Sequence, residues 1–206
     1  MIGMSETTDR DGNAVVGVAT TPEEWRAYLM RYGDLYVQEA DYDELVDLLE
    51  EEDLEAYDRG EHVRPWLGET PAAQEDVVAA EERLGVRFPP GLRAFFLTSN
   101  GWTCLANSWV GGSVYPCDRV TWMRDSESGD SVIEIYDGIP GNEDDVQLFR
   151  RSLEIAHDED FWLLDPTDTG PDGEWAAYTF SPKYGNPSKY PSFFALFHSG
   201  YEAMQR

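Results

Sequence analysis

The sequence is poor in lysine and in positive charge as a whole. Of its 206 residues, 15 are Lys or Arg and 41 are Asp or Glu, which gives a formal net charge of −26; the only lysines are Lys183 and Lys189. Binding to nucleic acid or to an anionic membrane surface needs cationic patches, so we expect neither partner. The acidic balance instead favours solubility and attraction to cationic partners.

Long apolar runs and cysteine-rich patterns are also missing. No stretch approaches the length of a membrane span, and the first residues, "MIGMSETTDRDGN", lack the basic and apolar regions of a signal peptide. Two cysteines, Cys104 and Cys117, do not make a disulfide framework, and we expect both to be reduced thiols. These features predict a cytoplasmic protein.

The usual motifs of catalysis and metal binding are absent from the sequence. His62, His157 and His198 lie in separate segments without zinc-site spacing, and there is no G-x-S-x-G elbow, although a triad with distant partners stays open. An acidic loop offers oxygen ligands for Ca²⁺ or Mg²⁺, but its spacing does not match an EF-hand, and an Asp/Gly/Pro-rich hairpin has the same composition. The loop residues are Asp165, Asp168, Asp172 and Glu174. We expect no enzyme activity, cofactor or metal, with a metal-dependent hydrolase as a competing hypothesis.

What the sequence does contain is apolar and aromatic material for a core. Hydrophobic residues make up 41% and aromatics 13%, with seven tryptophans, which suits one domain of ordinary size. Charge is unevenly spread, because residues 1–60 and 118–174 each carry net −13 while residues 61–117 carry only −2. Two acidic blocks therefore flank a nearly neutral segment.

Capping patterns predict two helices in the first block. Thr21-Pro22-Glu23-Glu24 has the pattern of a helix start, and we expect this helix to end at Gly33. Asp41 and Glu44 predict a second start. We expect the acidic run 50–53 at the C-terminal end of that second helix, where the helix dipole disfavours negative charge.

The neutral segment predicts a tight pair of helices. Thr70 and Pro71 would start the first and Gly85 would close it; Pro89-Pro90 would start the second. Asn100 and Gly101 both accept a positive φ, which predicts an abrupt stop that turns Trp102 towards the core.

After this point the pattern changes from helix to strand. Four segments are short and rich in β-branched and aromatic residues: 113–123, 131–136, 161–165 and 174–180. A final helix capped by Ser192 follows. This order predicts an α+β fold with a mainly antiparallel sheet, and apolar neighbours place Trp66, Trp102, Trp122 and Trp162 in its core.

One stretch resembles a known family. Residues 66–102, "WLGETPAAQEDVVAAEERLGVRFPPGLRAFFLTSNGW", are similar to the SUKH superfamily, named partly for fungal cell-wall-synthesis regulators of the Smi and Knr type. The family pattern is a helix ending in "E..LG", then "LPP.yr.Fl...NGw". The matching residues are Glu81, Leu84, Gly85, Pro89, Pro90, Phe96, Asn100, Gly101 and Trp102. Phe88 replaces the usual leucine, and Gly91-Leu92 stands where a polar residue and a tyrosine are common.

The resemblance extends over roughly residues 64–204 and implies a compact α+β domain without catalytic machinery. Many bacterial members look like immunity proteins that bind polymorphic toxins such as nucleases or deaminases, whereas fungal members are regulatory interaction proteins. We expect residues 1–19 to be flexible, residues 20–60 to be an acidic N-terminal helical extension, and residues 61–206 to be the SUKH-like domain.

The expected partner is a cationic toxin domain. We expect a bacterial immunity protein that occludes the active site of a basic, nuclease-type toxin, with its carboxylates where phosphates would lie; a regulatory scaffold of the Smi/Knr type is the alternative. Trp109, in a Gly-rich loop, is the expected aromatic anchor. The expected partner-binding residues are Trp109, Asp125, Glu127, Asp130, Glu134, Asp137, Glu143, Asp144, Asp145, Asp158, Glu159, Asp160, Asp168 and Asp172.

Overall fold

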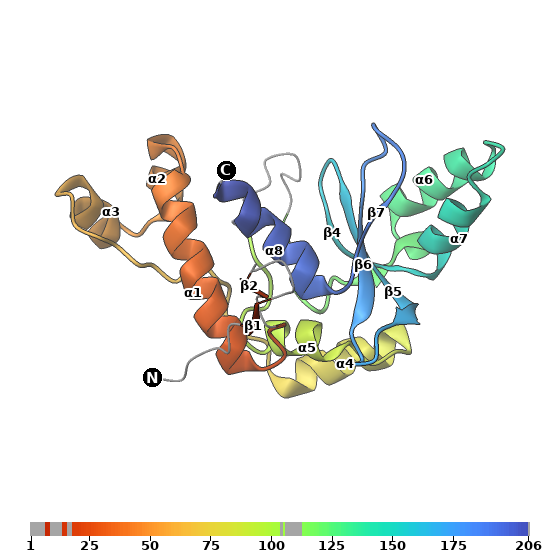
Figure 1. The fold of residues 1–206 in the computed structure, drawn as a ribbon, viewed down its shortest axis with the longest axis horizontal. Helices are drawn as coiled ribbons and strands as arrows, with labels where there is room; N and C mark the ends of the chain where they lie inside the picture. The colour runs from red at the N-terminus through yellow and green to blue at the C-terminus, as the bar shows by residue number, and fades with distance from the viewer. Residues whose placement is uncertain (1–6, 9–13, 16–17, 104, 106–112, 206) are drawn as a thin grey trace.

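A computed structural model describes residues 7–8, 14–15, 18–103, 105 and 113–205 and confirms the α+β prediction (Figure 1). The helices are α1 (Pro22–Glu39), α2 (Tyr42–Leu48), α3 (Glu51–Asp58), α4 (Gln74–Leu84), α5 (Pro90–Phe96), the 3₁₀ helix η1 (Met123–Asp125), α6 (Glu127–Asp137), α7 (Glu143–Arg151) and α8 (Phe193–Met204). The strands are β1 (Thr7–Thr8), β2 (Ala14–Val15), β3 (Thr121–Trp122), β4 (Leu153–His157), β5 (Phe161–Thr169), β6 (Trp175–Phe180) and β7 (Ser188–Tyr190).

The main sheet has five strands in the order β3-β4-β5-β6-β7, and every neighbouring pair is antiparallel. Its middle strand is buried on both faces from Phe161 to Asp165, instead of alternating between buried and exposed residues. A strand of this kind needs cover on both sides of the sheet. Within the described residues, strands β1 and β2 pair only with each other, as a separate two-stranded antiparallel sheet.

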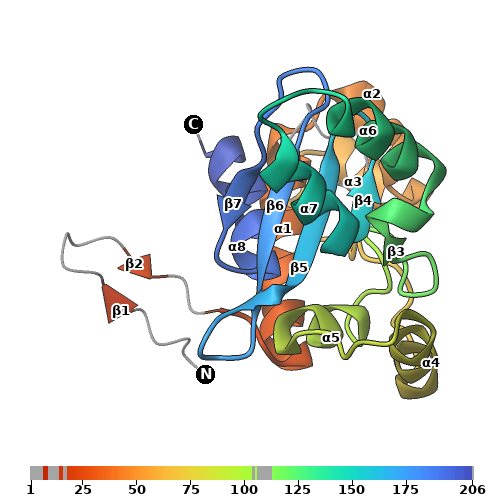
Figure 2. The same ribbon diagram turned by 90° about the vertical axis from the view of Figure 1, so that its right-hand side faces the viewer.

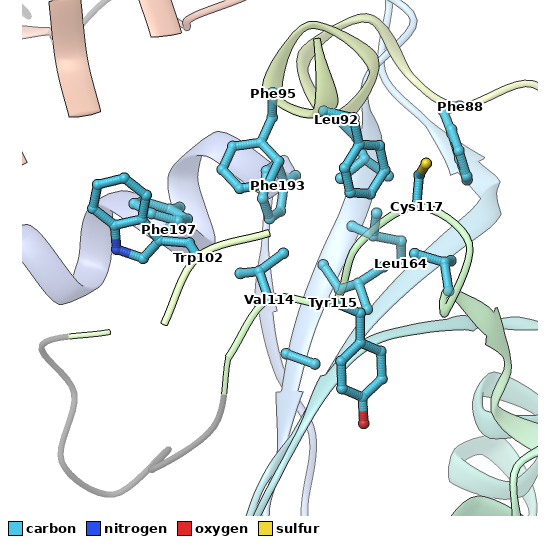
Figure 3. Packing of buried hydrophobic residues seen from close by; sticks show 14 of the residues in the cluster. Phe88, Leu92, Phe95, Trp102, Val114, Tyr115, Cys117, Leu164, Phe193 and Phe197 are labelled. Carbon is cyan, nitrogen blue, oxygen red and sulfur yellow. The ribbon is translucent and has the colours of Figure 1, made fainter. Parts of the chain in front are cut away.

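Helices supply this cover from both sides. Helices α1 and α8 lie over one face and α6 and α7 over the other, while α4 and α5 close one end (Figures 1 and 2). The α1/α8 side holds the larger core, in which Trp25, Phe95, Trp102 and Phe197 are all fully buried. Figure 3 shows Trp102 beside Phe197 in this core. The Trp25 indole Nε1 donates to the Gly91 carbonyl at 2.8 Å and so links α1 to α5.

The α6/α7 side of the sheet has a second core. Its buried residues are Met123, Ile133, Val146, Leu148, Phe149, Phe161, Leu163 and Phe180. A third, smaller cluster lies under α2 and α3, with Val37, Leu45, Leu49 and Val63 as its buried members. In the described ranges, no helix is long and apolar enough to cross a membrane.

The first helix is longer than predicted. It continues through Gly33 to Glu39, with Val37 extending its buried face. Gly33 itself is buried, and a Cβ there would lie 3.4 Å from two atoms of the Leu67 side chain. The glycine therefore packs against Leu67 at ordinary contact distance within the helix, and the prediction that it ends the helix was wrong.

The acidic run 50–53 was also misplaced. Helix α2 ends at Leu48, and Glu50 is the N-cap of α3, so Glu51, Glu52 and Asp53 form the first turn of a new helix. The N-terminal end of a helix dipole favours negative charge, so these residues stabilise α3 rather than oppose α2.

The predicted helix pair is present, with a shifted first start. Helix α4 begins at Gln74 rather than Pro71, because Ala72 is held extended by donating its N–H to the Phe96 carbonyl at 2.9 Å. Gly85 closes α4 with φ 72° and Gly101 has φ 125°, as predicted. Asn100 does not adopt a positive φ; its side-chain oxygen instead accepts from the Cys117 N–H at 2.8 Å.

The largest error concerns residues 131–136, which are helical in α6 and not a strand. Their β-branched residues suit either state, but a helix places Ile133 in the core and Tyr136 against the Phe180 ring at 5.3 Å. Residues 113–123 are mostly irregular, with an isolated bridge at Val114 and only Thr121–Trp122 in a strand. Segments 161–165 and 174–180 are strands, and Ser192 caps α8, as predicted.

Two of the four tryptophans predicted in the core are fully enclosed. Trp102 is 0% and Trp162 2% exposed. Trp66 and Trp122 are only partly buried and pack against the edge of the larger core.

Candidate protein-binding surface

The second acidic block folds into a helical hairpin, α6–α7, that lies on the sheet. Helix α6 buries Ile133, and α7 buries Val146 and Phe149 against β5 and β6. Because one stripe of each helix is used for packing, the charged residues collect on the opposite stripe and face solvent.

Polar contacts to buried carboxylates of the sheet fasten this hairpin where the chain enters α6 and where it leaves α7. Ser126 caps α6 by accepting from the Gly129 N–H at 3.0 Å, and it donates its own hydroxyl proton to Glu154 of β4. Glu154 is 3% exposed and also accepts from the Tyr115 hydroxyl at 3.0 Å. Where the chain leaves the hairpin, Arg151 of α7 donates to the fully buried Asp165 at 2.8 Å. The hairpin is therefore a platform that is fixed to the sheet where the chain enters it and where the chain leaves it.

Eight of the predicted residues lie on this platform, and seven of them are exposed; Asp145 is half-buried. They are Asp125, Glu127, Asp130, Glu134, Asp137, Glu143, Asp144 and Asp145. Burial and the charge of neighbouring Asp144 raise the pKa of Asp145, whereas backbone N–H groups at Glu143 and Gly141 lower the pKa of Glu143.

Only part of this negative charge is neutralised within the molecule. Arg150 pairs with Asp137 at 3.1 Å, and Arg124 approaches Asp125 at 3.9 Å. Within the described residues, no ion pair is found for the remaining six carboxylates. These are Glu127, Asp130, Glu134, Glu143, Asp144 and Asp145.

The other predicted residues do not form one surface with each other. The exposed turn at Asp158 and Glu159, with half-buried Asp160, precedes β5, whereas Asp168 and Asp172 lie at or beyond its far end. Seven residues of β5, 161–167, lie between Asp160 and Asp168, which corresponds to about 25 Å along the strand. Asp168 is engaged by Lys189 and by the Tyr178 hydroxyl, and Asp172 accepts from the Glu174 N–H at 3.2 Å. Trp109 lies outside the described residues, and so does Cys104.

The sequence motif of residues 81–102 has a structural explanation at the α4–α5 junction. Glu81 is 7% exposed, and its Oε1 accepts from the Phe88 N–H at 3.1 Å and from the Arg93 guanidinium. The buried carboxylate of Glu81 thus joins the α4–α5 connection, at Phe88, to helix α5, at Arg93. In the sequence, Glu81 is recognisable only as a residue of the family motif, because its spacing from Arg93 gives no sign of this contact.

A profile of the SMI1 / KNR4 family (SUKH-1) matches residues 71–197 of the chain. The chain belongs to this family. The match covers the α4–α5 motif, the whole sheet, the acidic hairpin and the first half of α8, and it confirms the SUKH resemblance. Comparison with curated proteins gives no match.

The competing metal hypothesis depends on the acidic loop, and the loop carboxylates of this SUKH-1 member point to different partners. Asp165 faces Arg151 and Thr167, Asp168 faces Lys189, and Glu174 accepts from the Gly91 N–H at 2.6 Å. No group of three or more His, Cys, Asp or Glu side chains that could hold a metal occurs in the part of the chain that the structure describes.

The histidines are dispersed as well. His157 stacks on Phe161, His198 hydrogen-bonds the Tyr28 hydroxyl at 3.0 Å, and His62 lies beside Asp34. Cys117 is buried, and burial raises the pKa of its thiol, which lowers the thiolate fraction available for nucleophilic chemistry.

Glu174 predicts a measurable pH effect on stability. Its carboxyl group is 1% exposed, and one oxygen, Oε2, has no hydrogen-bond partner; burial raises its pKa above the usual range. A carboxyl whose pKa is raised by folding contributes most stability at pH values below its unfolded pKa, and it loses that contribution as pH rises through the folded pKa. We expect Glu174→Gln, which stays neutral and keeps an acceptor for Gly91, to increase the unfolding free energy at neutral pH by about 1 kcal/mol.

Urea denaturation of both proteins from acidic to neutral pH measures this effect. The gain over wild type should grow as pH rises and vanish at low pH. Glu159→Gln, an exposed carboxyl in the β4–β5 turn, is the control and should leave stability unchanged. A gain for Glu174→Gln that is equal at every pH would contradict the assignment.

Proposed function

We propose that this SUKH-1 protein is a non-enzymatic immunity protein that neutralises a basic, nuclease-type toxin. The α6–α7 hairpin is the proposed contact surface. The observation that carries the proposal is a helical hairpin fixed to the sheet, with six exposed or half-buried carboxylates for which the described residues offer no ion pair, in a chain of net charge −26.

The mechanism follows from electrostatics and from rigidity. A nuclease presents a cationic groove suited to phosphates, and carboxylates held on a fixed helical surface attract that groove at long range. Once docked, the hairpin would fill the groove and exclude substrate, so no bond needs to be made or broken. The contacts of Ser126 with Glu154 and of Arg151 with Asp165 keep the carboxylates in place before binding, which lowers the ordering cost of association.

The test is capture followed by inhibition. The protein is immobilised, a native bacterial lysate is passed over it at low salt, and bound protein is eluted with a salt gradient and identified. The proposal expects a single basic protein that elutes at high salt, with nuclease activity that falls to background when one equivalent of the SUKH-1 protein is added. An identified partner whose binding ignores salt would support a regulatory scaffold instead, and a captured nuclease that stays active would refute neutralisation.

A further inference from the structure

Three large apolar side chains are exposed at one corner of the acidic hairpin. Ile135 is 63% exposed, Ile139 47% and Tyr184 69%. Ile135 lies in the last turn of α6, Ile139 follows in the α6–α7 connection, and Tyr184 lies in the β6–β7 connection. We refer to these three residues as the apolar tip.

Packing around Tyr136 brings the two segments together. Its ring lies 5.3 Å from that of Phe180, at the end of β6, and its hydroxyl lies 3.9 Å from the position that a Cβ at Gly185 would occupy. Tyr136 thus bridges α6 and the β6–β7 connection. The chain neighbours of Tyr136 and Gly185, which include Ile135 and Tyr184, therefore lie at the same corner.

The fold does not account for this exposure. Single exposed apolar residues are common on protein surfaces. Three large ones from two segments at one corner, however, form an apolar patch that is exposed to water. Elsewhere, Tyr42 and Val46 of α2 are 51% and 46% exposed, but there the Tyr42 hydroxyl donates to Asp58 of α3 at 3.3 Å and so ties two helices together. For the three residues of the apolar tip, the described contacts include no such link between elements.

The unpaired charge on the α6 side of the apolar tip is negative. Glu134 directly precedes Ile135 and has no ion pair within the described residues, whereas Asp137, two positions after Ile135, is paired with Arg150. Lys183 lies 5.8 Å from the centroid of the Tyr184 ring, so the positive charge is confined to the β6–β7 side. An apolar group bordered by carboxylates is complementary to an apolar patch bordered by lysine or arginine.

We infer that the apolar tip anchors the partner, a basic protein whose apolar patch is ringed by lysine or arginine. The inference rests on the proposed function and specifies its contact. The carboxylates speed and orient the encounter, whereas burial of Ile135, Ile139 and Tyr184 excludes water at the centre of the contact and slows dissociation.

Two synthetic peptides of about 15 residues test this anchor without the natural partner. One is built from lysine and leucine, with leucine at helical spacing i, i+3, i+4 and i+7; the other has serine in place of leucine and the same charge. We expect the full-length protein to bind the leucine peptide about tenfold more tightly than the serine peptide, as partial burial of one leucine side chain predicts. Titration calorimetry gives both dissociation constants.

Variants then locate the preference. In Ile135→Ser/Tyr184→Ser, the leucine preference should fall to less than about twofold while binding of the serine peptide stays the same. The matched control is Tyr42→Ser/Val46→Ser, which removes the same kinds of exposed side chain from the other acidic block and should keep the full preference. Circular dichroism checks that each variant is folded.

The outcomes separate this inference from the proposed function. Three results would overturn the anchor, even if the protein inhibits a basic nuclease: a leucine preference that survives in the tip variant, one that disappears in the control, or none in wild type. A preference that is lost only in the tip variant supports the anchor. It does so even if no captured nuclease is inhibited, because failed inhibition counts only against neutralisation.

Discussion

Trp102→Ala is expected to lower the unfolding free energy by about 3–5 kcal/mol and the Tm by about 10 °C. Trp102 is fully buried, and its ring packs at right angles to those of Tyr32 (5.8 Å) and Trp66 (6.2 Å) and lies 6.0 Å from that of Phe197. These rings come from α1, from the segment before α4 and from α8, so truncation leaves a cavity at the point where three parts of the chain meet.

Thermal and urea unfolding of purified protein measure the loss. Tyr184→Ala is the control, because that ring is 69% exposed and its removal should change stability by less than about 0.5 kcal/mol. Trp102 also occupies the last position of the family motif. A Trp102→Ala protein as stable as wild type would mean that the motif serves something other than the core.

Charge reversal on the hairpin is expected to slow association with the captured basic partner about tenfold at low salt. The variant is Glu134→Lys/Asp144→Lys, which changes one exposed carboxylate near the end of α6 and one in the first turn of α7. Both carboxylates face solvent, so we expect the fold to tolerate the change, apart from a small helix-dipole cost at Asp144.

A matched control separates local from global charge. Asp43→Lys/Asp47→Lys reverses one first-turn and one last-turn carboxylate of α2, so both variants have the same net charge. Stopped-flow or surface-based kinetics should show slower association for the hairpin variant and a much smaller effect for the α2 variant. Equal slowing in both would mean that the total charge of the protein, and not the α6–α7 surface, steers the partner.

Local signals in the sequence predicted much of the fold. Capping residues such as Thr21 and Ser192, the left-handed glycines at 85 and 101, and the apolar spacing around Phe95 act over a few residues, and their structural outcome agrees with the prediction. Errors arose where tertiary packing outweighed a local preference. Helix α1 continues past Gly33 and buries Val37, and residues 131–136 are helical with Ile133 in the core and Tyr136 against Phe180 of β6.

The candidate surface was predicted only in part. The concentration of negative charge in residues 118–174 does not show which carboxylates face solvent: Glu154, Asp165 and Glu174 are buried, whereas most carboxylates of the hairpin are exposed. The path of the chain decides which carboxylates lie together. The chain reverses between α6 and α7, which brings the carboxylates from Asp125 to Asp145 onto one hairpin. Strand β5, in contrast, separates Asp158–Asp160 from Asp168 and Asp172. The exposure of Ile135, Ile139 and Tyr184 was not predicted. Nothing in the sequence marks these residues as exposed, because apolar residues in or beside a strand-like pattern indicate a buried core.

By itself, the sequence determined the family, the α+β class, the helix caps and the net negative charge, because each depends on residue type or on spacing within one turn or one strand. Only the tertiary structure decided the α6–α7 hairpin, the burial of Glu81, Glu154 and Asp165 among their partners, and the corner shared by Ile135 and Tyr184. These features join residues that are 12 to about 50 positions apart, and such pairs are selected by the free energy of packing the whole core rather than by any local preference.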